Sequence, residues 1–328
     1  MSHQVSKSVY FVLSGLALLL AFVFPSSLNA QSNPGKAAPI TGPDEIFLNV
    51  NITSNDGKIL AGLPTEKFSL YLDKEPQKIK NFTNKSLPAS MLILFDLTKS
   101  MQDNPLYKDI SAAKEAFTRF FKASDPANEY ALLSFGNIAK PVQDWTGDIN
   151  AVLAGFDKIA SDKPSGTSNL VTLCLESIEK LRSRSHPRRV VLLVTDMHGD
   201  LDYKTSTLRR SLQETNSLIY LVCIGKLSGP VSAGGTLDML GQTQLRQVAE
   251  LSGGMALFPQ TVEDFGKSLQ WIATDLRNQY LLSFQPPTSV KADKEYPLEV
   301  TVSFPPDAPK EVKDMKVRHR RFFIGQNR

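Results

Sequence analysis

The chain has 328 residues, of which 41% are hydrophobic and 21% are charged. These proportions are typical of a folded globular protein and exclude an intrinsically disordered one, and the length allows one large domain or two to three ordinary ones. The formal net charge is only +4, and the basic residues are mostly scattered, so nothing in the composition indicates a nucleic-acid partner.

Residues 1–30 have the features of a secretory signal peptide. Lys7 supplies a positive charge before an apolar stretch that ends at Phe24, and the segment finishes at the small residue Ala30. The alternative is an uncleaved membrane anchor, but the apolar stretch is shorter than the ~20 residues that a spanning helix needs. We therefore expect cleavage, a secreted or periplasmic location, and no membrane span afterwards. Residues 31–43 are rich in Pro, Gly and Ser and are expected to form a flexible linker.

Two strand-like segments flank a longer region in which strands and helices alternate. Residues 44–88 contain short strand candidates separated by turn residues, and residues 279–328 return to the same character. Between them, residues 89–278 alternate apolar strand candidates with helix candidates, the pattern of a doubly wound α/β sheet with mainly parallel strands. Each flanking segment alone has too few strands, whereas together they have about six or seven, enough for a sandwich. We therefore predict a Rossmann-like α/β domain inserted into a small β-sandwich formed by the N- and C-terminal strands.

Five oxygen-bearing side chains follow predicted strands or precede a predicted helix of this α/β region. Asp96, Thr98 and Ser100 follow the first strand at a spacing of two residues, Thr167 lies in a Ser-Gly-Thr-Ser loop, and Asp196 ends a later apolar strand. Ligands of doubly wound sheets bind at the carboxyl ends of the strands, near a topological switch point. Carboxylate and hydroxyl oxygens are suitable ligands for a hard cation such as Mg²⁺. The sequence therefore predicts a metal site formed by these five residues.

At these positions the sequence resembles the von Willebrand factor type A family. That family's metal-ion-dependent adhesion site is an Asp-x-Ser-x-Ser motif with a distant Thr and a distant Asp, which the five residues match in order. Over nearly all of residues 45–325 the chain also resembles the bacterial VWFA-related proteins found notably in Acidobacteria, with matching segments that include DLTKSM, SGTSNL and VVLLVTD. The resemblance implies a type A domain that acts as a non-enzymatic, adhesion-type protein-binding module. It would hold Mg²⁺ (or Mn²⁺, or Ca²⁺), and an acidic side chain of a partner protein would complete the coordination shell.

Several positions around the motif depart from the family pattern. Thr98 stands in place of the usual Ser; it keeps the hydroxyl but adds a methyl group that stiffens the side chain. Lys99 and Met197 stand where Gly is usual, so that Lys99 could repel a cation or point to solvent, and Met197 loses easy access to positive φ. Ser168 begins a stretch that replaces an aromatic–Asp sequence. These departures leave a second interpretation open: a metal-independent structural module of the cell envelope with a degenerate site.

A third interpretation is a metal-dependent hydrolase that uses the acidic loop of Asp196, His198, Asp200 and Asp202. It is the least favoured, because no second His or acid at helical spacing joins the loop. No nucleophile elbow, phosphate loop or zincin motif is found in the sequence. We therefore expect no catalytic residues and no organic cofactor.

Two further features have structural interpretations. Cys174 and Cys223 have apolar neighbours, which predicts buried free thiols, although an exported protein could oxidise them. The one dense basic run, Arg318 to Arg321, lies in an alternating stretch near the C-terminus and is expected to be a solvated strand face.

Overall fold

The computed structural model describes residues 45–167, 169–196, 205–224, 235–304 and 314–326. Several sequence expectations fall outside these ranges: the signal peptide and linker, Ser168, Met197, and the loop with His198, Asp200 and Asp202. Within the described residues, no helix has both the length and the apolar character that crossing a membrane requires.

A six-stranded sheet forms the centre of the α/β region, in the order β10-β9-β8-β5-β6-β7. All neighbouring strands are parallel except β6 and β7, which are antiparallel. Every residue of the central strand β5 is buried, as expected for an uninterrupted apolar strand covered on both faces. The bounds are β5 (Ala89–Asp96), β6 (Glu129–Phe135), β7 (Ala139–Thr146), β8 (Arg188–Thr195), β9 (Ser217–Cys223) and β10 (Met255–Leu257).

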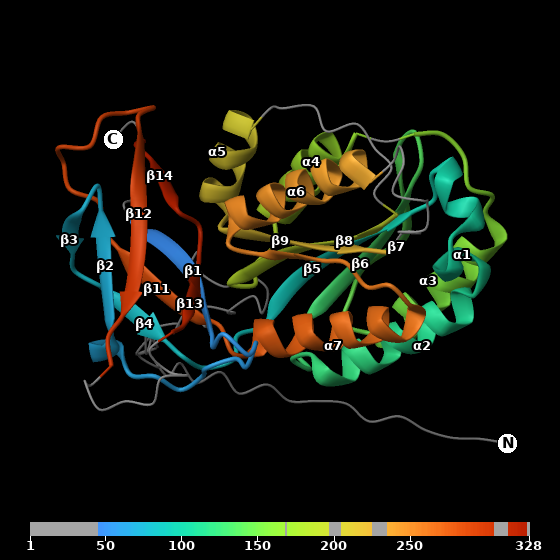
Figure 1. The fold of residues 1–328 in the computed structure, drawn as a ribbon, viewed down its shortest axis with the longest axis horizontal. Helices are drawn as coiled ribbons and strands as arrows, with labels where there is room; N and C mark the ends of the chain where they lie inside the picture. Colours follow the sequence, from blue (N-terminus) through green and yellow to red (C-terminus); the bar gives the residue numbers. More distant parts are fainter. Residues whose placement is uncertain (1–44, 168, 197–204, 225–234, 305–313, 327–328) are drawn as a thin grey trace, which may run out of the picture. The chain divides into compact units, whose positions relative to one another are not determined.

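Helices cover both faces of this sheet and bury a separate core against each (Figure 1). One core contains buried residues of α2 (Ile110–Ala123), α3 (Ile149–Ser161) and α7 (Val262–Arg277). It is rich in aromatic rings; those of Phe117 and Phe156 lie 4.7 Å apart. The other core contains buried residues of α4 (Leu170–Arg182), α5 (Thr205–Thr215) and α6 (Gly235–Ser252). A 3-10 helix, η2 (Lys99–Asp103), and the short helix α1 (Pro105–Lys108) connect β5 to α2.

The remaining strands form two four-stranded sheets, ordered β13-β1-β11-β4 and β14-β12-β2-β3 (Figure 1). Each sheet combines strands that precede the α/β region with strands that follow it, and the two sheets share one hydrophobic core. The predicted fold class, a doubly wound α/β domain inserted into a small sandwich, is therefore confirmed. The bounds are β1 (Ile46–Thr53), β2 (Phe68–Leu72), β3 (Glu75–Gln77), β4 (Asn81–Thr83), β11 (Tyr280–Phe284), β12 (Glu295–Val302), β13 (Lys316–Arg318) and β14 (Phe322–Ile324), with a 3-10 turn, η1 (Thr65–Lys67), before β2.

The prediction of a solvated face for the C-terminal basic run is wrong. His319 and Arg320 are only 4% and 3% exposed. Arg318 forms an ion pair with Asp275 of α7, which is completely buried, and donates from Nε to the Gly253 carbonyl at 3.0 Å. Contacts with α7 and with the end of α6 therefore cover a segment that its alternating pattern alone would leave in water.

Cys174 and Cys223 are buried free thiols, as expected. Both belong to the core between the sheet and α4, α5 and α6. Burial raises the pKa of the Cys174 thiol to about 12, so this thiol stays protonated and unreactive at neutral pH.

Candidate metal centre

The site begins where β5 ends. Asp96 is the last residue of the strand and is completely buried. Its Oδ1 atom accepts hydrogen bonds from the Thr98 backbone N–H at 2.7 Å and from Thr98 Oγ1 at 2.6 Å. A short acidic side chain readily bonds to the backbone two residues ahead, which turns the chain sharply. Thr98 is also the N-terminal cap position of η2, so the turn directs the chain from the sheet into that helix.

The neighbouring strand β8 supplies the opposite side of the site. β5 and β8 are in parallel register up to Phe95 and Val194, so their next residues emerge at the same edge of the sheet. Thr195 donates from Oγ1 to Asp96 Oδ2 at 2.6 Å. Asp196, which is 3% exposed, accepts a hydrogen bond from Ser100 Oγ at 3.0 Å.

Four of the five predicted ligands therefore lie in one hydrogen-bonded chain of oxygens. Thr98 Oγ1 and Ser100 Oγ are 3.0 Å apart and connect the Asp96 carboxylate to that of Asp196.

The fifth predicted ligand, Thr167, lies beside this cluster without a hydrogen bond from its hydroxyl to it among the described residues. The loop before it is attached to the end of β5 by two backbone hydrogen bonds, Ser165 N–H to Leu97 O at 2.8 Å and Lys99 N–H to Gly166 O at 3.1 Å. The Thr167 N–H donates to Asn137 Oδ1 at 3.1 Å.

Gly166 makes this close arrangement of loops possible. Its φ of +80° is one that residues with a side chain rarely adopt. A Cβ atom at this position would lie 2.2 Å from Asn137 Oδ1. The backbone next to Thr167 is thus held against the site by contacts that only glycine permits.

The electrostatics of the site are dominated by the burial of Asp96. Burial raises the pKa of its carboxyl to about 6, although hydrogen bonds from Thr195 and Thr98 lower it, and the nearby Asp196 raises it further. Among the described residues, no lysine or arginine is paired with Asp96, whose donors are hydroxyls and one backbone N–H. The Lys99 side chain is exposed. At neutral pH the Asp96 carboxylate is therefore a buried negative charge whose hydrogen-bond donors among the described residues are all neutral.

Carboxylate and hydroxyl oxygens are the kind of ligand that Mg²⁺ takes. Adjacent ligands of an octahedral ion with metal–oxygen distances of about 2.0–2.1 Å lie about 2.8–3.0 Å apart, whereas for Ca²⁺, at about 2.3–2.6 Å, the separation is about 3.3–3.7 Å. Ser100 Oγ lies 3.0 Å from both Thr98 Oγ1 and Asp196 Oδ1. The described residues contain no group of three or more His, Cys, Asp or Glu side chains that could hold a metal, so a metal ion here would depend on the hydroxyl oxygens as ligands.

Sequence reasoning missed two residues of the site. Thr195 bonds to Asp96 across the sheet, and its signal was its position beside Asp196 at the end of a strand. Asn137 holds the loop of Thr167. Its signal was a Gly-Asn turn directly after β6, but nothing in the sequence connects that turn to a loop about thirty residues later.

Comparison with known proteins shows what the domain around this site is similar to. Residues 91–198 match the family model of the von Willebrand factor type A domain. The fold is similar to BatB from Bacteroides thetaiotaomicron, at 16% identity and a TM-score of 0.43, covering 57% of this chain and 98% of that one. It is also similar to the type V pilus tip protein Mfa5 from Porphyromonas gingivalis (vWF domain), at 9% identity and a TM-score of 0.44, covering 58% and 95%. A third similar structure is a von Willebrand factor type A protein from Catenulispora acidiphila, at 11% identity and a TM-score of 0.45. The match covers 81% of this chain and 72% of that one. No curated protein matches the chain.

Proposed function

The chain is a von Willebrand factor type A domain protein, and from this premise we propose that it binds a partner protein through a divalent metal ion. The metal would be held by Asp96, Thr98, Ser100, Thr167 and Asp196. The partner would contribute an acidic side chain. No enzymatic step is part of this proposal.

One observation carries the proposal: two nearly completely buried carboxylates, Asp96 and Asp196, are joined through hydroxyls at the carboxyl end of the sheet. The donors to Asp96 among the described residues are neutral, and a buried charge without an opposite charge costs several kcal/mol. Burial raises the pKa of Asp96 only to about 6, so protonation does not remove this cost at neutral pH. A divalent cation would remove it.

Each residue has a distinct task in such a site. Asp96 and Asp196 supply negative charge, and Thr98, Ser100 and Thr167 supply neutral oxygens. When bound, Mg²⁺ (or Mn²⁺, or Ca²⁺) supplies a positive centre that keeps exchangeable positions for further oxygen ligands. Because most of the protein's donors are neutral, a carboxylate from a partner is still attracted. Thr195 orients Asp96 by its hydrogen bond to Oδ2, the kind of outer contact that tunes metal affinity.

The location proposed for this binding is outside the cytoplasm, in the periplasm or the medium, on the basis of the signal-like first 30 residues of the sequence. The proposed partner is therefore an envelope or extracellular protein. Neither nucleic acid nor a membrane span is part of the proposal.

A pull-down from envelope extract tests the proposed function. Wild-type protein should retain a partner in Mg²⁺ and release it in EDTA, and Asp96→Ala should not retain it. Asp157→Ala is the matched control, because Asp157 lies on the exposed face of α3, paired with Lys114. Partner retention that is indifferent to both EDTA and Asp96→Ala would remove the metal from the account.

That last result would support a second candidate, a metal-independent structural module of the envelope. The observation in its favour is that both oxygens of Asp96 already accept hydrogen bonds from within the chain. We rank it second because those donors are neutral and leave the carboxylate charge without a cation.

A further inference from the structure

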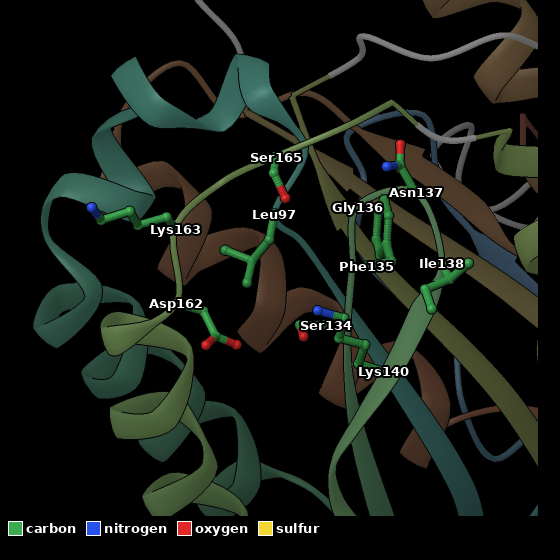
Figure 2. Close-up of a pocket in the computed structure, with 10 residues that line it drawn as sticks. All are labelled: Leu97, Ser134, Phe135, Gly136, Asn137, Ile138, Lys140, Asp162, Lys163 and Ser165. Atoms are coloured by element: carbon green, nitrogen blue, oxygen red, sulfur yellow. The ribbon is translucent and has the colours of Figure 1, made fainter.

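A groove with a volume of about 480 Å³ opens beside the metal site (Figure 2). One wall includes Leu97, which lies between Asp96 and Thr98 in the chain, and Ser165 from the loop that leads to Thr167. The other wall is the hairpin between β6 and β7. The groove and the site therefore share the same loops.

These shared loops are tightly packed. Leu97 N–H donates to the Phe135 carbonyl at 2.7 Å, and Ser165 N–H donates to the Leu97 carbonyl at 2.8 Å. A Cβ atom on Gly136 would lie 2.4 Å from the Ser165 carbonyl oxygen. A ligand in the groove would thus meet a surface whose position relative to the site is fixed by close backbone contacts.

Two hydrogen-bond donors line the groove without a partner among the described residues. Ser134 is 3% exposed, and its hydroxyl forms no hydrogen bond with the described residues. Lys140 is paired with Ser134 across the β6–β7 ladder, and its side chain extends toward the middle of the groove (Figure 2). No described carboxylate forms an ion pair with Lys140. An ammonium and an almost completely buried hydroxyl together form a site for an acceptor, best a carboxylate.

The rim adds an apolar contact. Ile138 is 66% exposed, the largest exposure of any large hydrophobic side chain among the described residues. It lies at the tip of the β6–β7 hairpin, next to Asn137, which holds the loop of Thr167. An isolated exposed isoleucine is common; here it offers an apolar contact at the hairpin that forms one wall of the groove.

We propose that the groove binds a second carboxylate of the same partner segment whose first carboxylate reaches the metal. Lys140 Nζ and Ser134 Oγ donate to this second group, and an apolar side chain between the two acids packs on Ile138. The partner is therefore an extended peptide segment with two acidic residues separated by an apolar one. This inference rests on the proposed function and specifies the partner of the same site.

The charged side chains that line the groove make an acidic occupant testable. Its lining has two lysines, Lys140 and Lys163, against one carboxylate, Asp162. Figure 2 shows the ammonium of Lys163 pointing away from Lys140 and Ser134. Asp162 opposes an acidic ligand, so removing its charge should strengthen binding, whereas an occupant of another charge type would give the opposite result.

A random peptide library selected on the full chain in Mg²⁺ tests the proposal. Peptides that elute with EDTA are expected to carry two acids flanking an apolar residue. For a selected peptide, Lys140→Met should weaken binding about tenfold, the equivalent of one charge-assisted hydrogen bond, and Ser134→Ala should weaken it less. Asp162→Asn should strengthen binding. Lys163→Met, the matched loss of charge outside the groove centre, should change binding far less than Lys140→Met.

The outcomes separate the two levels of the proposal. EDTA-sensitive peptides without a second acidic position, or equal binding by wild type and Lys140→Met, would overturn the groove assignment and leave the metal-dependent function intact. If no EDTA-sensitive peptide is selected, the groove assignment fails together with the proposed function. Mg²⁺ affinity measured without peptide should be the same for Lys140→Met and wild type, which shows that the variant's metal site is unaltered.

Discussion

The buried carboxyl of Asp96 makes the stability of the metal-free protein depend on pH in an unusual direction. Its pKa is raised from an ordinary 3.8 to about 6, mainly by burial. Between these two pH values the folded state binds more protons at this group than the unfolded chain does. The free energy of unfolding therefore falls as pH rises through this window. The difference between the two pKa values corresponds to about 3 kcal/mol.

The substitution Asp96→Asn removes this titration and isolates its effect. In EDTA, we expect the free energy of unfolding of Asp96→Asn minus that of wild type to grow by about 2 kcal/mol from pH 4 to pH 7. If the Asn side chain itself changes the free energy of unfolding by an amount that does not depend on pH, that amount cancels when the difference at pH 7 is compared with the difference at pH 4. The assay is urea unfolding followed by the fluorescence of Trp145 and Trp271 at a series of pH values.

A matched control and a refuting result complete this test. Asp157→Asn changes an exposed carboxylate of α3 and should leave the pH dependence parallel to wild type. If Asp96→Asn is also parallel to wild type, the carboxyl is not in the dehydrated environment that the site geometry implies. Added Mg²⁺ should stabilise wild type at pH 7 far more than at pH 4, because protonation of Asp96 competes with the cation.

Three further predictions concern the supports of the site and the sandwich. His319 accepts a hydrogen bond from the Val300 N–H at Nε2, and burial lowers its pKa from 6.5 to about 4. Between these pH values the folded state binds fewer protons than the unfolded chain does. The free energy of unfolding therefore falls by about 3 kcal/mol as pH falls from 6.5 to 4. His319→Gln should flatten this dependence in urea unfolding, and curves parallel to wild type would refute it. Gly166→Ala should lower the free energy of unfolding by about 1–3 kcal/mol and weaken Mg²⁺ binding. The control is Gly57→Ala, which has a similar φ but nothing within 4 Å of an added Cβ; it should cost less stability and leave Mg²⁺ binding unchanged. Equal effects of the two variants in calorimetry would contradict the role of the close contacts around Gly166. Asp275→Ala leaves Arg318 without its buried partner and should cost about 3–5 kcal/mol in thermal unfolding, while a loss below 1 kcal/mol would contradict that network's role.

The sequence was sufficient to predict the central strand and the alternation around it. The run that ends at Asp96 is apolar throughout, which only a strand covered on both faces tolerates. Strand order beyond this, and the pairing of β1 with β11 about 230 residues later, depend on contacts that no local pattern encodes. The division of one sandwich between two ends of the chain could still be inferred, because neither end has enough strands alone.

The candidate site was predictable where its residues follow strand ends. Asp96, Thr98, Ser100 and Asp196 come together because neighbouring parallel strands end at the same edge. The hydroxyl of Thr167 is the exception, since it lies among the eight residues between α3 and α4, and a connecting segment can place a side chain in many ways.

The basic run was misassigned for a related reason. A period of two separates the faces of a strand but does not say whether a distant element covers the outer one. Arg318 meets α7 and the end of α6, contacts that only the tertiary structure reveals. Asn137 was missed in the same way, because its partner loop is distant in sequence.

Isothermal titration calorimetry of the full chain with Mg²⁺ tests the central claim most directly. We expect saturable one-site binding by wild type at neutral pH, weaker binding of Ca²⁺ because its ligands need wider spacing, and no binding by Asp96→Ala. The control Asp157→Ala should bind Mg²⁺ as wild type does. An absence of Mg²⁺ binding by folded wild type, or equal binding by Asp96→Ala, would contradict the metal-dependent account.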